Sequence, residues 1–505
     1  MHIKSPSPAP SAPVVLISGA GAAGLTLAID LARRGVAFRL IDKAAEPFPG
    51  SRGKGIQPRS QEVFEDLGVL DRMVAVGGRY PMLRTYAGDR VEDVAMMEER
   101  PVTPAEPYVT PLMLPQARTE AVLRERLAEL GHHAEFACEL LGFEQDGEGV
   151  TARLSAGGRE ETLRVAYLVG ADGGRSFARH ALDIGFPGET LPVRALVADL
   201  DLEGLSRDRW HRWNITRGDQ LSLCPLGGTD LFQLQAGLVQ PGEPDLSAPA
   251  IERLIAERTG RTDLTVHAVR WASGYGMNVR LADRYRVGRV FLAGDAAHVH
   301  PPTGGQGLNT SVQDAYNLGW KLAAVLAGAP ESLLATYEAE RRPVAAHVLG
   351  LARSLLQAAR ERGEMRRGRE THELDIGYFD SSLALDARGR SGTLAAGGRA
   401  PDAPCRGAAG QPLRLFNLLL GPQWTLLGYE VERASLGPAR AGLAIHTVGV
   451  RGDIVDADGH IRTAYDLTPG DRVLIRPDGY VGAFVDGDGQ TALEDYLAKV
   501  GLTGG

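Results

Sequence analysis

The sequence predicts an α/β protein with a Rossmann-like nucleotide-binding domain, an antiparallel-sheet domain and a C-terminal α/β domain. Three observations carry this prediction. Near the N-terminus, a short apolar run leads into a glycine-rich loop and a helix. After residue 289, a second apolar run ends in a motif rich in Gly, Asp and Pro. Between these motifs, and again after residue 395, strand-like segments alternate with turn residues.

The N-terminal motif has the order of a dinucleotide-binding βαβ unit. Val14–Ile17 is apolar throughout, as expected for a strand buried on both faces. A helix is predicted over 22–34, with Gly35 as its cap. Glycines in the loop permit a tight turn, close approach of a pyrophosphate and close helix–strand packing. The positions assigned to this loop are Gly19, Gly21, Ala22, Ala23 and Gly24.

A second predicted strand, 38–41, ends at an acidic residue. Asp42 is placed to accept hydrogen bonds from ribose hydroxyls, and Lys43 lies beside it. The N-terminal end of the preceding helix suits an anionic pyrophosphate. The N-terminal motif therefore predicts the part of a dinucleotide site that binds the adenosine.

The late motif follows the strand predicted over 289–293. Asp295 would hydrogen-bond a polyol chain such as ribityl, at the sheet edge where ligands bind. The prolines of the following loop restrict its backbone, and its glycines carry no side chains. A flat ring can therefore lie directly against the backbone of this loop. A helix starting at Asn309 or Thr310 would direct its positive end toward that ring. The residues assigned here are Gly294, Asp295, Pro302, Gly305, Gly307, Leu308 and Asn309. The two motifs together predict bound FAD and redox chemistry.

The chain also resembles class A flavin-dependent aromatic hydroxylases of the para-hydroxybenzoate hydroxylase kind. The resemblance is carried by residues 19–24, 51–59, 115–118, 170–176 and 294–309. Within that family it is similar to polyketide and antibiotic hydroxylases of the angucycline and rifampicin monooxygenase type, which have a C-terminal thioredoxin-like domain. The resemblance implies that Arg52 lies near the pyrophosphate, Gln116 at ribityl, and Asp172 near both the pyrophosphate and NAD(P)H.

The resemblance implies a mechanism as well. Non-covalent FAD is reduced by NADPH or NADH, takes up O₂ as a hydroperoxide, and passes one oxygen to an electron-rich aromatic ring. Pro302 and Gly305 would hold the flavin in its oxygenating position through backbone groups. The sequence has no second G-x-G-x-x-G motif, which fits a transient visit by the nicotinamide nucleotide.

Tyr275, flanked by glycines, is the first candidate for a base that activates a phenol. A packed tyrosine with a satisfied hydroxyl is the commoner situation. We expect structural hydrogen bonds for His298 and His300. Arg217 and His211 could meet an anionic substrate, although exposed polar positions are the default. A substrate that carries its own acidity would need no dedicated base.

The predicted organisation is discontinuous. Arginines between 360 and 369 suggest a solvated helix face, and the lone Cys405 offers no thiol redox chemistry. A structural or dimer-contact role is favoured for the C-terminal domain. The predicted parts are a disordered tail (1–13), the FAD-binding domain (14–80, 109–185 and 280–360), the antiparallel-sheet substrate domain (81–108 and 186–279), a helical linker (361–394) and the thioredoxin-like domain without Cys-x-x-Cys (395–505).

Composition excludes several function classes. The 505 residues suffice for two or three domains, and a net charge of −8 argues against nucleic acid as a main partner. No apolar run approaches the roughly 18 residues that would span a bilayer, and residues 1–13 lack the apolar core expected of a signal peptide. The three cysteines have neither disulfide nor metal spacing. We expect a cytoplasmic enzyme, monomeric or homodimeric, with a small aromatic substrate.

Alternatives stay open. Baeyer–Villiger oxygenation differs from hydroxylation only in hydroperoxide protonation and substrate pose. Halogenation is disfavoured, because Trp210–Asn214 has the wrong spacing for the Trp-x-Trp-x-Ile-Pro motif of flavin halogenases. A flavoprotein that binds a ligand without catalysis is the third alternative.

Overall fold

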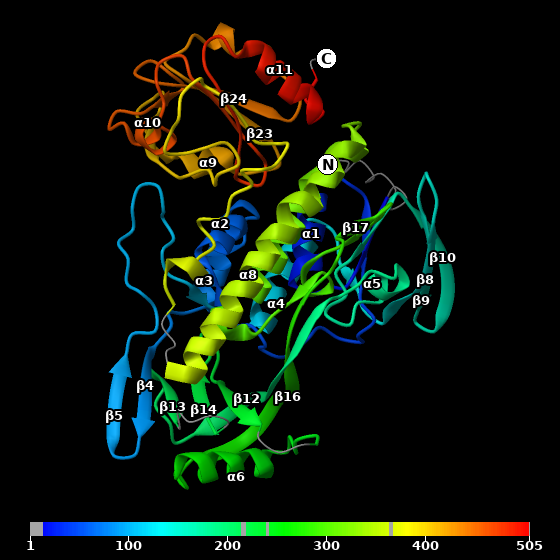
Figure 1. Cartoon of the computed structure of the whole chain (residues 1–505), viewed down its shortest axis with the longest axis vertical. Helices are drawn as coiled ribbons and strands as arrows, with labels where there is room; N and C mark the ends of the chain where they lie inside the picture. Colours follow the sequence, from blue (N-terminus) through cyan, green and yellow to red (C-terminus); the bar gives the residue numbers. More distant parts are fainter. Residues whose placement is uncertain (1–13, 214–218, 239–241, 363–366, 504–505) are drawn as a thin grey trace, which may run out of the picture.

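The computed structural model describes residues 14–213, 219–238, 242–362 and 367–503. Figure 1 shows three bodies along its long axis. The sheet that carries both nucleotide motifs lies in the middle, a mostly antiparallel sheet lies at one end, and the C-terminal domain lies at the other. The long helix α8 (Ala335–Arg362) runs along the middle body toward the antiparallel sheet.

The central sheet brings the two motifs together. Its six strands have the order β17-β18-β11-β1-β2-β7. The four middle strands are parallel, and only β11 separates β1 from β18. The bounds are β17 Arg286–Val287, β18 Val290–Leu292, β11 Tyr167–Gly170, β1 Val15–Ser18, β2 Phe38–Ile41 and β7 Ala134–Glu135. The carboxyl ends of β1, β11 and β18 therefore meet at one sheet edge, where ligands bind in open α/β sheets.

Burial explains why these segments form this core. Strands β1, β11 and β18 are buried along their whole length, as their unbroken apolar sequences predict. Helix α1 (Ala22–Arg33) is buried from Ala22 to Leu31. It packs against α7 (Gly307–Leu326) and α4 (Gln116–Glu129). Each buried leucine or isoleucine of this core contributes about 1.5–3 kcal/mol.

The second, mostly antiparallel sheet covers the middle body at the end opposite the C-terminal domain, and we call it the roof sheet. Its order is β19-β16-β12-β15-β14-β13-β4-β5, and helix α6 (Ala248–Thr259) packs against it. The bounds are β19 His298–Val299, β16 Thr265–Leu281, β12 Gly188–Glu203, β15 Phe232–Leu238, β14 Leu221–Pro225, β13 Arg209–Trp213, β4 Met82–Ala87 and β5 Arg90–Val94. Strand β16 reaches β19 in the late motif. One long strand thus connects the roof directly to the flavin loop.

Smaller elements complete the middle body. A three-stranded sheet, β10-β9-β8, flanks the central sheet, and β3 pairs with β6. These elements are β3 Gly55–Ile56, α2 Pro58–Asp66, α3 Leu70–Val76, β6 Leu112–Met113, β8 Cys138–Gln145, β9 Val150–Ala156, β10 Arg159–Val165 and α5 Phe177–Ala181.

The C-terminal domain has a mixed sheet of order β20-β27-β26-β23-β24-β25-β21-β22. Its bounds are β20 Leu385–Ala387, β21 Pro404–Gly407, β22 Pro412–Arg414, α9 Leu415–Leu419, β23 Trp424–Tyr429, β24 Leu443–Val448, β25 Ile454–Val455, α10 His460–Tyr465, β26 Arg472–Ile475, β27 Val481–Val485 and α11 Gln490–Lys499. Strands β26 and β27 form a hairpin around Pro477–Gly479. The α/β fold class predicted from the sequence is confirmed.

The helical linker expected over 361–394 is wrong. Helix α8 ends at Arg362, and within 367–394 the structure has one 3₁₀ turn, at 369–371, and strand β20. Strand β20 pairs with β27, so this segment belongs to the C-terminal sheet. Pairing across nearly one hundred residues leaves little local signal in so short a strand.

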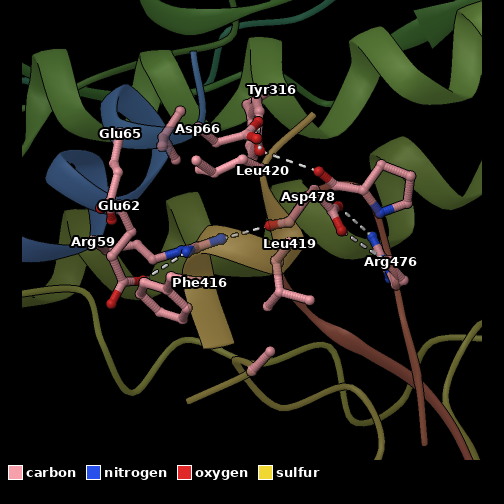
Figure 2. Close-up of a pocket in the computed structure, with 14 residues that line it drawn as sticks. Arg59, Glu62, Glu65, Asp66, Tyr316, Phe416, Leu419, Leu420, Arg476 and Asp478 are labelled. Atoms are coloured by element: carbon pink, nitrogen blue, oxygen red, sulfur yellow. Dashed lines mark hydrogen bonds and ion pairs between the residues drawn. The ribbon is translucent and has the colours of Figure 1, made fainter. Parts of the chain in front are cut away.

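Buried hydrogen bonds join the C-terminal domain to the middle body, and Figure 2 shows two of them. Arg59 on α2 pairs with Glu62 and donates to the Asp478 carbonyl at 2.6 Å. The Tyr316 hydroxyl donates to the Pro477 carbonyl at 3.0 Å. The space left between these residues is only about 40 Å³, too small for an aromatic ligand. This junction is structural.

Candidate cofactor and substrate site

The glycine loop after β1 has no room for side chains. Gly19 has φ +111°, and a Cβ added there would lie 2.2 Å from the Ala171 carbonyl oxygen. A Cβ on Gly24 would lie 1.9 Å from the Gly19 carbonyl oxygen. The Asp42 carboxylate accepts the Ala20 N–H at 2.8 Å, which holds the acid of β2 against this loop. The glycine loop, the start of α1 and the Asp42 carboxylate thus lie next to one another in the site.

Asp172 follows β11 at the same sheet edge. One of its carboxylate oxygens accepts the Ala178 N–H at 3.0 Å. The other oxygen is buried and has no hydrogen-bond partner among the described residues. A buried acceptor without a partner is costly, so this oxygen is available to a donor of a bound molecule.

One buried carboxylate, missed in the sequence, fixes the turn after β18. Asp314 on α7 accepts the Gly294 N–H at 3.2 Å, the His298 Nε2 at 2.7 Å and the Arg341 Nε at 2.7 Å. His298 is therefore held structurally, as expected. The side chain of Asp295, between these anchored groups, is exposed. His300 is half-buried, and the surrounding protein lowers its pKa to about 4, so it is neutral at pH 7.

Two amide side chains fix the loop that precedes α7. Asn309 Oδ1 accepts the Gln57 N–H at 2.8 Å, and Asn309 Nδ2 donates to the carbonyls of Gly55 at 2.9 Å and Gly305 at 2.8 Å. Gln57 Nε2 donates to the Gly304 carbonyl at 3.2 Å. Pro302 is exposed beside these anchored glycines, and α7 begins at Gly307, two or three residues earlier than predicted. The loop has a fixed shape and an open face.

Arg52 and Gln116 lie on the two segments that approach the loop from the other side. The Arg52 guanidinium lies 5.0 Å from the Phe48 ring centre and 5.9 Å from that of Trp271. Gln116 Nε2 donates to Glu120 Oε1 at 2.8 Å. Their contacts with FAD stay predictions, as do those of Gly21, Ala22, Ala23, Lys43, Asp295 and Leu308.

Glu120 is a second site residue that the sequence did not reveal. It is 1 % exposed on α4, bonds the Ala22 N–H of the glycine loop as well as Gln116, and lies near Asp42 and Arg124. Burial raises its pKa. A Cβ on Gly21 would be 3.7 Å from its carboxylate. A charged Glu120 therefore faces the place expected for an anionic pyrophosphate.

We expect FAD affinity to fall as pH rises through the raised pKa of Glu120, because the ionised carboxylate repels the pyrophosphate. Glu120→Gln should remove this pH dependence and tighten FAD binding about tenfold at the alkaline end. Titration of the apoprotein with FAD, followed by flavin fluorescence at several pH values, measures the effect. Glu125→Gln, exposed on the same helix, is the matched control. An unchanged pH profile in Glu120→Gln would contradict the prediction.

A third buried acid lies beneath α7. Glu373 is 3 % exposed and accepts the Thr310 hydroxyl at 3.1 Å and the Gln313 amide. Burial raises its pKa to about 7, although Arg341 acts in the opposite direction. The folded protein therefore binds a proton here more tightly than the unfolded chain does.

The sign of the stability effect follows from linkage. Glu373 contributes stability below the ordinary glutamate pKa of about 4.3 and loses it as pH rises to about 7, by up to roughly 3 kcal/mol. Glu373→Gln should raise the melting temperature at pH 8 and leave it nearly unchanged at pH 5. Thermal unfolding at both pH values checks this, and an equal shift at both would refute it.

The residues of the roof sheet that are predicted to act on a substrate differ in how far they are buried. Tyr275 on β16 is half-buried; burial raises its pKa, and the nearby charge of Arg52 opposes that shift. Its role as a base stays a prediction. His211 is buried, with Nδ1 at 2.8 Å from the Tyr86 hydroxyl and Nε2 at 2.9 Å from the Ser206 carbonyl. Both ring nitrogens are thus engaged within the protein. Arg217 lies outside the described residues.

A cavity of about 780 Å³ opens where the roof meets the middle body. One wall is the start of α4 with Ser51, and the other is β12 with the turn between β14 and β15. Ser51 donates to the buried carboxylate of Asp199 at its base. The size suits a small organic ligand. The cavity borders both segments assigned to the cofactor, 51–52 and 115–118.

Cysteine and metal chemistry find no support in the described residues. Cys138, Cys224 and Cys405 are free and buried, and burial raises the pKa of Cys405 to about 11. No group of three potential metal-ligating side chains occurs in the described part of the chain.

None of the described helices combines the length and apolar character needed to cross a bilayer.

Known proteins share this architecture. A family model for an FAD binding domain matches residues 12–352, and one for the C-terminal domain of aromatic-ring hydroxylases matches 393–501. The chain is 45% identical over 498 residues to a flavin-dependent monooxygenase of Mycobacteroides abscessus, which covers 96% of this chain and 99% of the relative. It is 40% identical over 354 residues to a rifampicin monooxygenase of Streptomyces venezuelae, covering 68% and 71%.

Solved structures agree. An aklavinone-11 hydroxylase with bound FAD and aklavinone superposes with a TM-score of 0.81 at 28% identity, covering 97% of this chain and 99% of the other. Fold and site thus define a flavin-dependent monooxygenase. The chain belongs to the FAD-dependent aromatic-ring hydroxylases.

Family membership confirms FAD as the cofactor and implies O₂ and a reduced nicotinamide. The local structure fits FAD. The glycine loop is a cradle that a Cβ at Gly19 or Gly24 would fill, and Asp172 offers a buried acceptor without a partner. The non-catalytic alternative is thereby set aside, since the relatives are monooxygenases.

Proposed function

We propose that the protein uses NADPH or NADH and O₂ to hydroxylate a phenolic ring of a small, polyketide-like or antibiotic-like molecule. The observation that carries the proposal is the anchored loop at 302–305. It lies beneath the roof sheet, and Asn309 and Gln57 fix its backbone. FAD, once bound and reduced, supplies the oxygen-activating chemistry.

The chain's own residues would position and protect that chemistry. Gly19, Gly24, Asp42 and Asp172 would hold the dinucleotide at the sheet edge, and Gln116 with Asp295 its polyol chain. The backbone of Pro302 and Gly305 would set the plane of the ring, while the start of α7 would stabilise negative charge on it. The roof sheet would cover the ring and limit its contact with water, because water would otherwise divert the reaction from oxygen transfer.

The reductant is proposed to visit transiently. The described residues show one glycine-rich nucleotide loop, at 19–24, and its edge is assigned to FAD. The open cavity beside Ser51 and Arg118 reaches the cofactor segments from solvent. A second nucleotide would therefore meet the flavin without a dedicated Rossmann domain.

Stopped-flow reduction of the purified holoenzyme by NADPH, with and without phenols and polycyclic quinones, tests this function. We expect one ligand class to accelerate flavin reduction sharply and, in air, to gain one oxygen atom. Mass spectrometry identifies the added oxygen, and NMR separates a phenol product from a ring-expanded ester of Baeyer–Villiger type. A flavin that no ligand renders reducible by either nicotinamide would overturn the proposal.

A further inference from the structure

Glu373 is a buried acid in a strained backbone conformation beneath the first turns of α7. Its carboxyl group accepts the Thr310 hydroxyl at 3.1 Å and the Gln313 amide. Its backbone has φ +63°, a left-handed conformation that is unfavourable for a residue with a Cβ. Such strain persists where the surrounding structure enforces it, and it occurs preferentially at functional sites. Glu373 has no part in the function proposed above.

Glu373 forms no ion pair within the described residues, although charged groups act on it. Arg341 on α8 lowers its pKa and Asp314 on α7 raises it, but these two pair with each other at 2.7 Å. Burial outweighs both and raises the pKa of Glu373 to about 7. The other titratable groups on the elements around Glu373 have partners of their own or are neutral: Arg59 pairs with Glu62, His298 with Asp314 and Arg369 with Glu106 and Asp375, the Tyr378 hydroxyl accepts Arg341, Arg367 lies beside Tyr80, and burial lowers the pKa of His372.

Both hydrogen-bond partners of the carboxyl group can reverse their roles. An ionised carboxylate only accepts, whereas a protonated carboxyl must also donate. Gln313 Oε1 is buried and has no partner in the described structure, so rotation of this amide would bring an acceptor to the carboxyl proton. The Thr310 hydroxyl can donate to Glu373 or to the Gln306 carbonyl, which lies at 3.0 Å. The site can therefore hold the carboxyl group with or without its proton.

The first turn of α7 connects Glu373 to the flavin loop. Gln306 immediately precedes α7 and belongs to the loop on which the flavin ring is proposed to lie. In that arrangement the positive end of α7 faces the ring and stabilises negative charge on it. An ionised Glu373 draws on the same helix end. The two negative charges therefore disfavour each other.

We propose that Glu373 takes up a proton when the flavin is reduced and releases it when the flavin is reoxidised. A hydride adds two electrons and one proton to the oxidised ring, which then carries one negative charge. The Glu373 carboxylate binds a proton from solvent, so its own negative charge is removed. The proposed coupling rests on the flavin placement given under the proposed function, but it requires neither the aromatic substrate nor the nicotinamide nucleotide.

Coupling between two sites is reciprocal. If reduction of the flavin raises the pKa of Glu373 by about one pH unit, ionisation of Glu373 makes the flavin about tenfold harder to reduce. The effect is confined to alkaline solution, because Glu373 is protonated in both redox states well below pH 7. Glu373→Gln cannot ionise, so its flavin should be about tenfold easier to reduce than that of the wild type at pH 9 and equally reducible at pH 5.

The test is a redox titration of the holoenzyme against a dye of known potential, with xanthine and xanthine oxidase as the source of electrons. Neither NAD(P)H nor an aromatic ligand is added. Glu373→Asp keeps an acid at this position and should behave like the wild type at pH 9. Glu370→Gln, exposed in the same segment, should change nothing. The flavin content of every variant is measured first.

Infrared difference spectra of the wild-type holoenzyme give a readout that needs no variant. Reduction at pH 8 should produce the C=O stretch of a protonated carboxyl group and remove the corresponding carboxylate bands. Glu373→Gln should lack both signals. A change in packing alone would not create a protonated carboxyl group on reduction.

Two outcomes would overturn the proposed coupling. One is a difference in flavin potential between the wild type and Glu373→Gln that is the same at pH 5 and at pH 9. The other is a wild-type spectrum in which reduction at pH 8 protonates no carboxyl group. Failure of the proposed function would look different, because the coupling would be observed although no aromatic ligand gains oxygen.

Discussion

Replacing Glu340 with alanine is expected to lower the free energy of unfolding by about 3–5 kcal/mol, because it leaves the buried Lys321 without its ion-pair partner and the buried Arg476 with Asp478 alone. Glu340 on α8 pairs with Lys321 of α7 at 2.6 Å and with Arg476 of the C-terminal domain at 2.8 Å. All three side chains are fully buried. This cluster joins the middle body to the C-terminal domain, so its loss should loosen the whole junction.

The pH dependence gives an independent check. Burial acts to raise the pKa of Glu340, but Arg476 and Lys321 outweigh it and hold the pKa well below its ordinary value. The stability from this group is present above the pKa of glutamate in the unfolded chain and is lost as pH falls through the lower folded value. Glu340→Ala should therefore be relatively less harmful in acid.

Urea unfolding of the holoenzyme at pH 7 and at pH 4 measures both effects. Glu129→Ala is the matched control, since that glutamate pairs with Arg72 and Arg126 on the surface, and such pairs contribute little. Equal midpoints for wild type and Glu340→Ala at pH 7 would show that the cluster does not stabilise the junction.

The elements of this fold that could be predicted from the sequence are those determined by residues close together in the chain. Strand β1, the glycine loop, α1 and β2 follow one another within thirty residues or so, and each has its own signature of apolar run, glycine or cap. The turn at Pro477–Gly479 is similar, because proline, aspartate and glycine encode a hairpin turn directly. The loop at 301–309 could be predicted for the same reason, because its prolines and glycines are local signals.

The remaining site residues depend on partners far along the chain. Gln57 donates to Gly304, 247 positions later, and the buried pair Lys54–Gln233 spans 179 positions. A single polar residue in an otherwise ordinary segment carries no periodic signal. The same holds for Asp314 and Glu120, which look like solvated helix positions until the fold buries them. The arginine-rich sequence around Arg367 predicts a solvated helix face, whereas the structure buries this side chain.

Gly24→Ala is expected to abolish FAD binding. The added methyl group would lie 1.9 Å from the Gly19 carbonyl oxygen and 3.3 Å from Leu40 Cδ1. The first contact is with backbone, so a rotamer change cannot relieve it. Either α1 moves away from β1, which opens the core, or the loop shifts and loses its cradle. In both cases the close approach that a pyrophosphate needs disappears.

Flavin content of the purified protein and FAD titration of its apoprotein measure the loss, which we expect to exceed about a hundredfold in affinity, roughly 3 kcal/mol. Gly350→Ala in α8 is the matched control. There an added Cβ meets no atom within 4 Å, so alanine should stabilise the helix by about 0.5–1 kcal/mol. A Gly24→Ala protein that purifies with a full complement of flavin would show that the pyrophosphate lies away from this loop. The dinucleotide would then have to bind at the late motif alone, and the shared sheet edge of β1 and β18 would lose its proposed role.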